Sequence, residues 1–168
     1  CSSDLLPNTK LIIPWQLEKF QPRLAAAKVN RPTAEYHLTC LPVLVQFVLA
    51  SGTGAEQVTY LDCDMQVYHR LDDVFREIGT NSIAIVARPL SPPIGELAVR
   101  GTYNTGWLTF RNDDHARKCL ERWRDHCLTW CHDPEKDDHF AKQTYVDDWP
   151  TQFSGVKVIG HPGVNLAP

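Results

Sequence analysis

The sequence has no marked excess of either charge and no long hydrophobic run. Its 17 Lys and Arg residues against 20 Asp and Glu residues give a net charge of -3. That balance gives no electrostatic reason to expect a nucleic acid or an anionic membrane surface as a partner. The longest apolar segment, residues 38–50, is interrupted by Pro42 and Gln46 and is shorter than the roughly 20 residues that a membrane-spanning helix needs. We therefore expect no nucleic-acid partner and no membrane span.

The chain also lacks an initiating methionine and the basic segment that opens a signal peptide. It begins Cys-Ser-Ser-Asp, and its single methionine is Met65. We therefore expect a processed product or a piece of a longer protein. Its 168 residues are enough for one hydrophobic core and too few for two, so we predict a single domain over residues 1–168.

The cysteines lack the spacing of a zinc site. Zinc ligands usually occur in pairs two to four residues apart on loops. Cys119, Cys127 and Cys131 recur instead with Leu120 and Trp123 at helical intervals, as one buried stripe would. We therefore predict free core thiols in place of a metal site or a disulfide scaffold. That usage favours a reducing, cytoplasmic setting.

Strand-like and helix-like segments alternate along the chain. Short apolar runs predict strands at residues 10–14, 57–61, 82–87, 106–110 and 156–159. Helical spacing predicts helices at residues 21–28, 34–49, 71–78, 113–131 and 139–147, the second of them kinked or split at Pro42. This alternation predicts an α/β architecture with a mainly parallel or mixed sheet flanked by helices.

Two aspartates follow the strand-like run 57–61 directly, in Asp62-Cys63-Asp64. In open α/β sheets, ligands bind outside the carboxyl ends of the strands. Strand alternation would put Asp62 and Asp64 on one side, within reach of one ion. Carboxylate oxygens suit Mg²⁺ or Mn²⁺, whose other ligands are commonly waters and substrate phosphates. Asp-x-Asp pairs are also common in solvated turns, and it is the apolar strand before this pair that favours a metal site.

Four segments, taken in order, resemble successive motifs of one enzyme family. They are Tyr60–Met65, Tyr103–Asn112, Tyr145–Pro150 and His161–Pro168. Together they resemble bacterial nucleotide-diphospho-sugar glycosyltransferases with the GT-A fold, which are distantly similar to the glycogenin-like transferases. The resemblance covers nearly the whole chain. It implies metal-dependent transfer of a sugar from a nucleoside-diphosphate donor, with UDP-sugar favoured, to an unknown acceptor with retention of anomeric configuration.

The resemblance also implies roles for individual residues. Asp62 and Asp64 match the pair that binds Mn²⁺ or Mg²⁺ and the diphosphate, and His161 matches the position of a third metal ligand. A surface or capped histidine is the alternative for His161. Asn104 and Gly106 fall in the loop that faces the donor sugar in such enzymes.

The catalytic candidates are Gln143 and Asp147, which lie with Asp148 where the family carries an acidic helix near the acceptor. One of these side chains would orient the acceptor hydroxyl. A solvated helix end before Pro150 is the alternative; it is favoured for Asp148 and stays open for Asp147.

Two departures from the family pattern bear on activity. Lys142 stands where family members carry an acid immediately before the glutamine. The chain also begins after the strand-helix-strand unit that supplies much of the nucleotide pocket in such enzymes. A sheet without that unit would have an exposed edge, and such edges promote association. We therefore expect an N-terminally abbreviated GT-A domain that forms a homodimer through this edge.

Two rival functions stay open. A non-catalytic GT-A-like fragment or binding domain would keep the fold and bind a ligand or partner without turnover; Lys142 and the abbreviated ends favour it. A haloacid dehalogenase-type phosphohydrolase also carries Asp-x-Asp after a buried strand. That family has a small β-branched residue two positions after the second aspartate, where this chain has Gln66, so this rival is the weaker one.

Overall fold

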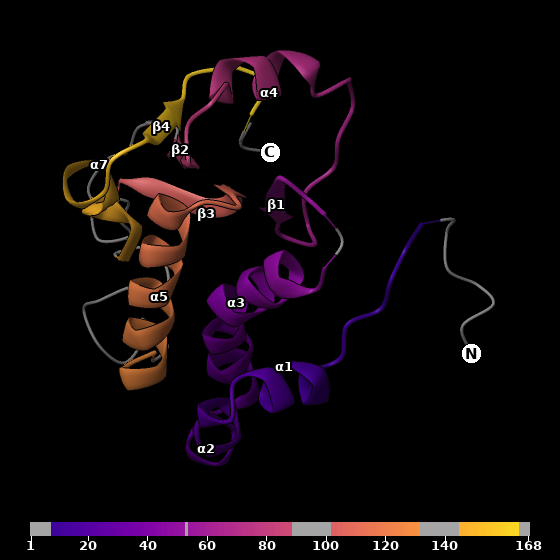
Figure 1. The fold of residues 1–168 in the computed structure, drawn as a ribbon, viewed down its shortest axis with the longest axis vertical. Coiled ribbons are helices and arrows are strands. Elements are labelled where there is room, and N and C mark those ends of the chain that lie inside the picture. The colour runs from indigo at the N-terminus through magenta and orange to yellow at the C-terminus, as the bar shows by residue number, and fades with distance from the viewer. Residues whose placement is uncertain (1–7, 53, 89–101, 132–144, 165–168) are drawn as a thin grey trace.

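The computed structural model describes residues 8–52, 54–88, 102–131 and 145–164. It has an α/β architecture in which a four-stranded mixed sheet is flanked by helices (Figure 1). The strands are β1 (Gln57–Leu61), β2 (Ile83–Ala87), β3 (Tyr103–Arg111) and β4 (Val156–Ile159), in the spatial order β1-β3-β2-β4.

Of the two predicted alternatives, the mixed sheet is confirmed and the mainly parallel sheet is wrong for the described strands. β3 pairs antiparallel with both β1 and β2, and only β2 and β4 are parallel. β3 is inserted between the strands that precede it in the chain and runs opposite to both. An apolar run shows that a strand is buried but carries no mark of its direction. The alternation of strands and helices therefore predicted the class and missed this strand's direction.

Most of the predicted helices are confirmed, with shifts at their ends. The described helices are α1 (Pro14–Phe20), α2 (Arg23–Asn30), α3 (Thr33–Ala50), α4 (Asp72–Ile78), α5 (Asp114–Thr129) and α7 (Trp149–Gln152). α3 continues through Pro42 and is not split there. α5 begins as predicted after Asp113, whose side chain accepts a hydrogen bond from the Ala116 backbone N–H at 2.9 Å. The helix predicted at residues 139–147 falls mostly outside the described residues.

The strand predicted at residues 10–14 is wrong. Residues 10–13 have no regular structure, and Leu11 and Ile13 are exposed. Pro14 occupies the first turn of α1, where its missing N–H costs nothing. The Gln16 side chain accepts a hydrogen bond from the Ile13 backbone N–H at 3.0 Å, which helps to begin the helix. Apolar composition alone does not distinguish such a segment from a short strand.

Both faces of the sheet are covered (Figure 1). On one face, Ile83 and Ile85 of β2 pack with residues of α3 and α5. On the other face, Ala84 and Val86 pack with residues of α4. β2 is therefore buried on both faces, as its continuous apolar run predicted. A third cluster joins α1, α2 and α3 away from the sheet.

The buried cysteines belong to these cores. Cys119 and Cys127 of α5 lie in the same cluster as Trp123, while Cys40 is buried in the cluster of α1, α2 and α3. None of these three thiols forms a disulfide within the described residues. Their predicted role as small core hydrophobes is confirmed.

α3 is the one helix in the described ranges that is long and apolar enough to cross a membrane. This is weak support for a span, because the core helices of globular proteins meet the same criterion. Its buried residues include Val43 and Val45, which pack in two of the core clusters. No membrane span is shown.

Candidate functional site

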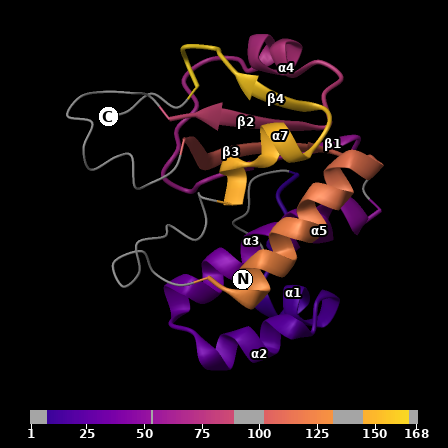
Figure 2. The same cartoon turned by 90° about the vertical axis from the view of Figure 1, so that its left-hand side faces the viewer.

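Three strand ends and one strand start meet at a single edge of the sheet, which we call the site edge. β2 and β4 are parallel (Figure 2), and β1 runs in the same direction because both β1 and β2 are antiparallel to β3. The carboxyl ends of β1, β2 and β4 therefore lie beside the first residues of β3. The topology brings the predicted site residues after β1, at the start of β3 and after β4 to the same edge.

Asp62 and Asp64 lie in a tight turn at the end of β1. The Asp62 backbone N–H donates to the Gly106 carbonyl oxygen at 2.9 Å, and the Met65 N–H donates to the Asp62 carbonyl oxygen at 3.1 Å. Asp62 is half-buried and Asp64 is exposed. Because the strand ends at Leu61, alternation does not govern the side chain of Asp64. That part of the sequence argument is wrong, although the turn still keeps both carboxylates at the site edge.

Tyr60 orients the first aspartate. Its hydroxyl donates to Asp62 Oδ1 at 2.5 Å, as two residues on the same side of a strand allow. Burial raises the pKa of Tyr60 above its ordinary value, and the hydrogen bond to Asp62 raises it further. The phenol therefore keeps its proton and its role as a donor across the physiological range. The sequence contained this signal, because Tyr60 stands two residues before Asp62.

β3 is irregular beside the Asp62 turn. Ile85 pairs with Leu108, but the next residue, Val86, pairs with Asn104, so β3 has extra residues at this point. Such bulges are common next to active sites, where they redirect side chains. The Asn104 side chain accepts a hydrogen bond from the Gly106 N–H at 3.0 Å. Asn104 and Gly106 were expected in a loop; they lie in this irregular part of a strand.

The absence of a side chain at Gly106 leaves a small cradle. A Cβ atom placed there would lie 3.4 Å from Asp62 Oδ2, 3.4 Å from Met65 Sδ and 3.5 Å from Asn104 Oδ1. The neighbouring Thr105 hydroxyl is buried and has no hydrogen-bond partner within the described ranges. A buried polar atom without a partner costs about 1–3 kcal/mol. A carboxylate oxygen and an amide oxygen therefore lie together around Gly106.

His161 follows β4 in a second tight turn. The Val164 N–H donates to the His161 carbonyl oxygen at 3.1 Å, and the Gly163 N–H donates to His161 Nδ1 at 3.1 Å. A neutral imidazole that accepts at Nδ1 carries its proton on Nε2. Binding a metal through Nε2 requires the other tautomer, with the proton on Nδ1. Metal binding by His161 in this way would therefore require release of the Gly163 contact.

Asp147 contacts the start of β3. Its Oδ1 accepts hydrogen bonds from the backbone N–H groups of Thr102 at 2.9 Å and Tyr103 at 3.2 Å. The catalytic candidate thus lies at the site edge, where it also fixes the first residues of β3. Asp148 has a different surrounding, because its carboxylate pairs with Arg122 of α5 at 2.6 Å. This ion pair agrees with the structural role that the sequence favoured for Asp148.

Gln143 and Lys142 lie outside the described residues. Within the described ranges, no three His, Cys, Asp or Glu side chains gather closely enough to hold a metal ion together. Strand spacing explains why: β1 and β4 are separated by two strands, so their ends lie about 14 Å apart at roughly 4.8 Å per strand. Asp62 and His161 reach a common ion only if both turns bend inward over the ends of β3 and β2.

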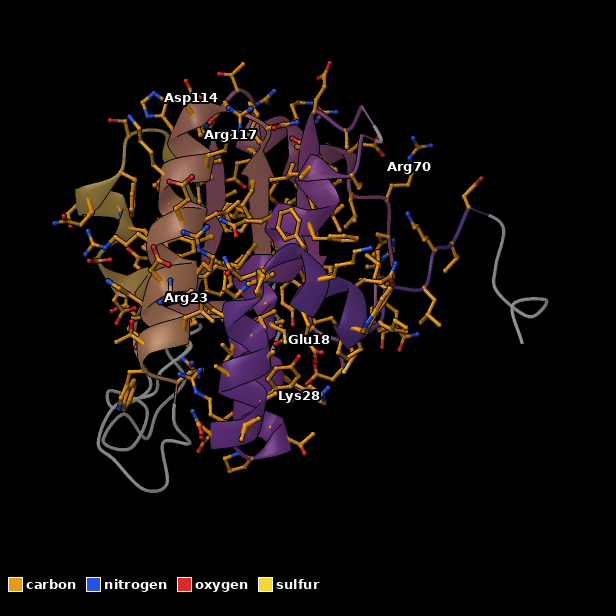
Figure 3. The ribbon with its side chains drawn as sticks, turned by 60° about the horizontal axis from the view of Figure 1, so that its bottom comes forward. Glu18, Arg23, Lys28, Arg70, Asp114 and Arg117 are labelled. Atoms are coloured by element: carbon orange, nitrogen blue, oxygen red, sulfur yellow. The ribbon has the colours of Figure 1, made fainter. Side chains whose placement is uncertain are left out.

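Two surface hollows lie between helices and away from the site edge. One, of about 350 Å³, lies between α2 and the end of α5, and the other, of about 320 Å³, lies between α1, α3 and α5. Arg23 borders the first and pairs with Asp125 of α5 at 2.9 Å (Figure 3). Neither hollow contains a residue that the sequence assigned to the site.

Comparison with known proteins identifies relatives but no function. No family model matches the chain, and no solved structure matches it. The chain is 31% identical over 150 residues to the uncharacterized protein YfnF of Bacillus subtilis strain 168. The aligned region covers 85% of this chain and 50% of YfnF. It is 30% identical over 166 residues to the uncharacterized protein YfnD of the same strain. That aligned region covers 92% of this chain and 53% of YfnD. The chain thus spans about half the length of these curated relatives.

Proposed function

We propose that this chain is the metal- and nucleotide-sugar-binding part of a GT-A-type glycosyltransferase. The observation that carries the proposal is the convergence at the site edge. Asp62 and Asp64 after β1, Asn104 and Gly106 in β3, and His161 after β4 are far apart in the sequence and lie at one edge of the sheet. Carboxyl ends of strands are the usual ligand-binding edge of an open α/β sheet.

The chemistry of the donor set fits a hard divalent cation. Asp62 and Asp64 would hold Mn²⁺ or Mg²⁺, with His161 as a third ligand, and the ion would neutralise the charge of a leaving diphosphate. Two protein carboxylates are a common number for such ions, whose other ligands are substrate phosphates and waters. Tyr60 holds Asp62 in place through its hydroxyl, so this carboxylate is positioned before any ligand arrives.

The other residues would bind and orient the sugar. The Asn104 amide and the Gly106 backbone lie beside Asp62, where a donor sugar attached to the diphosphate would lie. Asp147 is near the start of the same strand, on the side proposed for the acceptor. Catalysis would then depend mainly on positioning and on stabilising the leaving group.

Release of UDP from a panel of UDP-hexoses in the presence of Mn²⁺ tests this function. The wild type should release UDP, and Asp64→Asn should abolish the release. Asp73→Asn is the matched control, because Asp73 is an exposed aspartate that pairs with Arg76 on α4. Equal activity in all three proteins, or none in a folded wild type, would count against transferase chemistry at this site. Nuclear magnetic resonance of the product would test retention of anomeric configuration.

The alternative function is a non-catalytic domain that binds the nucleotide sugar or a partner. Lys142 favours it, since this lysine stands where the family that the chain resembles carries an acid. Nucleotide binding without any UDP release would support this alternative.

We also propose that β1 pairs with a second copy of this chain. β1 lies at an end of the described sheet. The backbone groups of Glu56 and Asp62 form hydrogen bonds with the chain of β3 and the residue that follows it. Alternate residues of a strand direct their N–H and C=O groups to opposite sides, so those of Thr59 point away from β3. Sedimentation velocity should show a dimer for the wild type and a monomer for Thr59→Pro, which removes an outward N–H. A wild-type monomer would contradict this pairing.

A further inference from the structure

The segment that carries His161 is bound by an acid from a distant part of the chain. Glu77, near the end of α4, accepts a hydrogen bond from the Gly160 backbone N–H at 2.8 Å. It also pairs with Lys157 of β4 at 3.1 Å. The Gly160 N–H is the main cause that holds the pKa of Glu77 below its ordinary value, and the His161 N–H contributes in the same direction. The Glu77 carboxylate thus binds the backbone of Gly160, the residue between β4 and His161.

α4 is well placed to connect the two parts of the proposed site. It is the first helix after the Asp62–Met65 turn, and it packs against β4. Val74 and Ile78, on either side of Glu77, are buried in the core on this face of the sheet. The Glu77 carboxylate therefore projects from a helix that is fixed by its packing in the core.

The width of the sheet makes such an anchor necessary. The ends of β1 and β4 are about 14 Å apart at ordinary strand spacing, so the turn after β4 must be held in a defined direction for His161 to approach Asp62.

We propose that Glu77 is a positioning residue that holds the Gly160–His161 backbone so that the His161 imidazole serves the ligand site. This inference rests on the proposed function. Glu77 itself touches neither metal nor nucleotide; it acts through the backbone of the residue that does. Partners of this kind, which orient a metal ligand from behind, typically change metal affinity about 10- to 100-fold when they are removed.

The test compares three variants by calorimetric titration of UDP in the presence of Mn²⁺. Glu77→Ala removes the acceptor, and its dissociation constant should rise about 10-fold or more. Glu77→Gln keeps an acceptor oxygen and should restore most of the affinity. Lys157→Ala removes the ion pair but leaves the backbone hydrogen bonds, so it should bind like the wild type. Equal weakening by Glu77→Ala and Lys157→Ala would show an effect of charge and would overturn the positioning role.

A double-mutant cycle separates positioning from general damage to the fold. In the His161→Ala background, Glu77→Ala should weaken UDP binding no further, because its route to the ligand is already lost. An additional loss of the same size as in the wild type would overturn the proposal. So would unchanged UDP affinity in Glu77→Ala alone.

Hydrogen exchange of the Gly160 amide gives a readout that needs no ligand. The Gly160 amide, which donates to Glu77, should exchange faster in Glu77→Ala than in Glu77→Gln, and unchanged exchange of this amide would overturn the anchor. Absence of Mn²⁺-dependent UDP binding by the wild type would refute the proposed function, and the positioning role with it. Normal wild-type binding that persists in Glu77→Ala would refute the positioning role alone.

Discussion

Gly106→Ala should leave the fold intact and weaken nucleotide binding. The new methyl group would meet Asp62 Oδ2 and Met65 Sδ at 3.4 Å and Asn104 Oδ1 at 3.5 Å, which is contact without overlap. The backbone of Gly106 is not in the positive-φ region, so alanine fits its conformation. Replacing a glycine in a strand by alanine at a compatible position changes stability by about 0.5–1 kcal/mol, in the favourable direction.

The effect on binding should have the opposite sign. The methyl group would occupy the small gap between Asp62 and Asn104, beside which we place the donor sugar. Loss of one hydrogen bond to a charged group costs about 1.5 kcal/mol or more, which corresponds to about a 10-fold rise in the dissociation constant for a UDP-hexose with Mn²⁺. Urea unfolding measures the first effect and calorimetry the second. Destabilisation by more than about 2 kcal/mol would refute the packing argument, and unchanged binding would refute the role of the cradle.

Three further predictions follow from single contacts. Asp113→Ala should lower the free energy of unfolding by about 1 kcal/mol in urea because it removes the N-cap of α5. Asp114→Ala, the control, removes only an exposed ion pair (Figure 3) and should cost about 0.5 kcal/mol or less. Asp147→Ala should lower the free energy of unfolding by about 1–3 kcal/mol because it leaves two backbone N–H groups at the start of β3 without their acceptor. Asp147→Asn keeps an acceptor and should lower it less. Equal losses for the two variants in urea would contradict this reasoning. The hydrogen bond that the Glu77 carboxylate accepts from a backbone N–H holds the pKa of Glu77 below its ordinary value. The contribution of the ionised carboxylate to the free energy of unfolding should therefore be complete above about pH 4.3. It should disappear as the pH falls through the lower pKa of the folded state. A difference between wild type and Glu77→Ala that grows on acidification would contradict that sign.

Local sequence patterns predicted most elements of the fold. The β2 run predicted a strand buried on both faces, and Asp113 predicted the start of α5; both are confirmed. These predictions succeeded because burial and capping depend on neighbouring residues. The direction of β3 depends on which strands lie beside it, and no local pattern records that. The exposed Leu11 was misassigned for a related reason, since an apolar residue in a short segment does not show whether another element covers it.

The site was predictable to a similar extent. The apolar strand before Asp62 predicted that the two aspartates follow a strand at the edge of the sheet, and the structure brings the described candidates to that edge. The turn at Asp64 was missed because a strand's end is not defined to the residue by its sequence. The contact between Glu77 and Gly160 links residues 83 positions apart, and a lone acid in a short helix gave no signal of it.

Calorimetric titration of UDP and GDP, with and without Mn²⁺, into the wild type and Asp64→Ala tests the central claim most directly. The account predicts that UDP binds only when Mn²⁺ is present and that binding disappears in the variant. A folded wild type that binds neither nucleotide, or a variant that binds as well as the wild type, would contradict a metal-dependent nucleotide site at the end of β1.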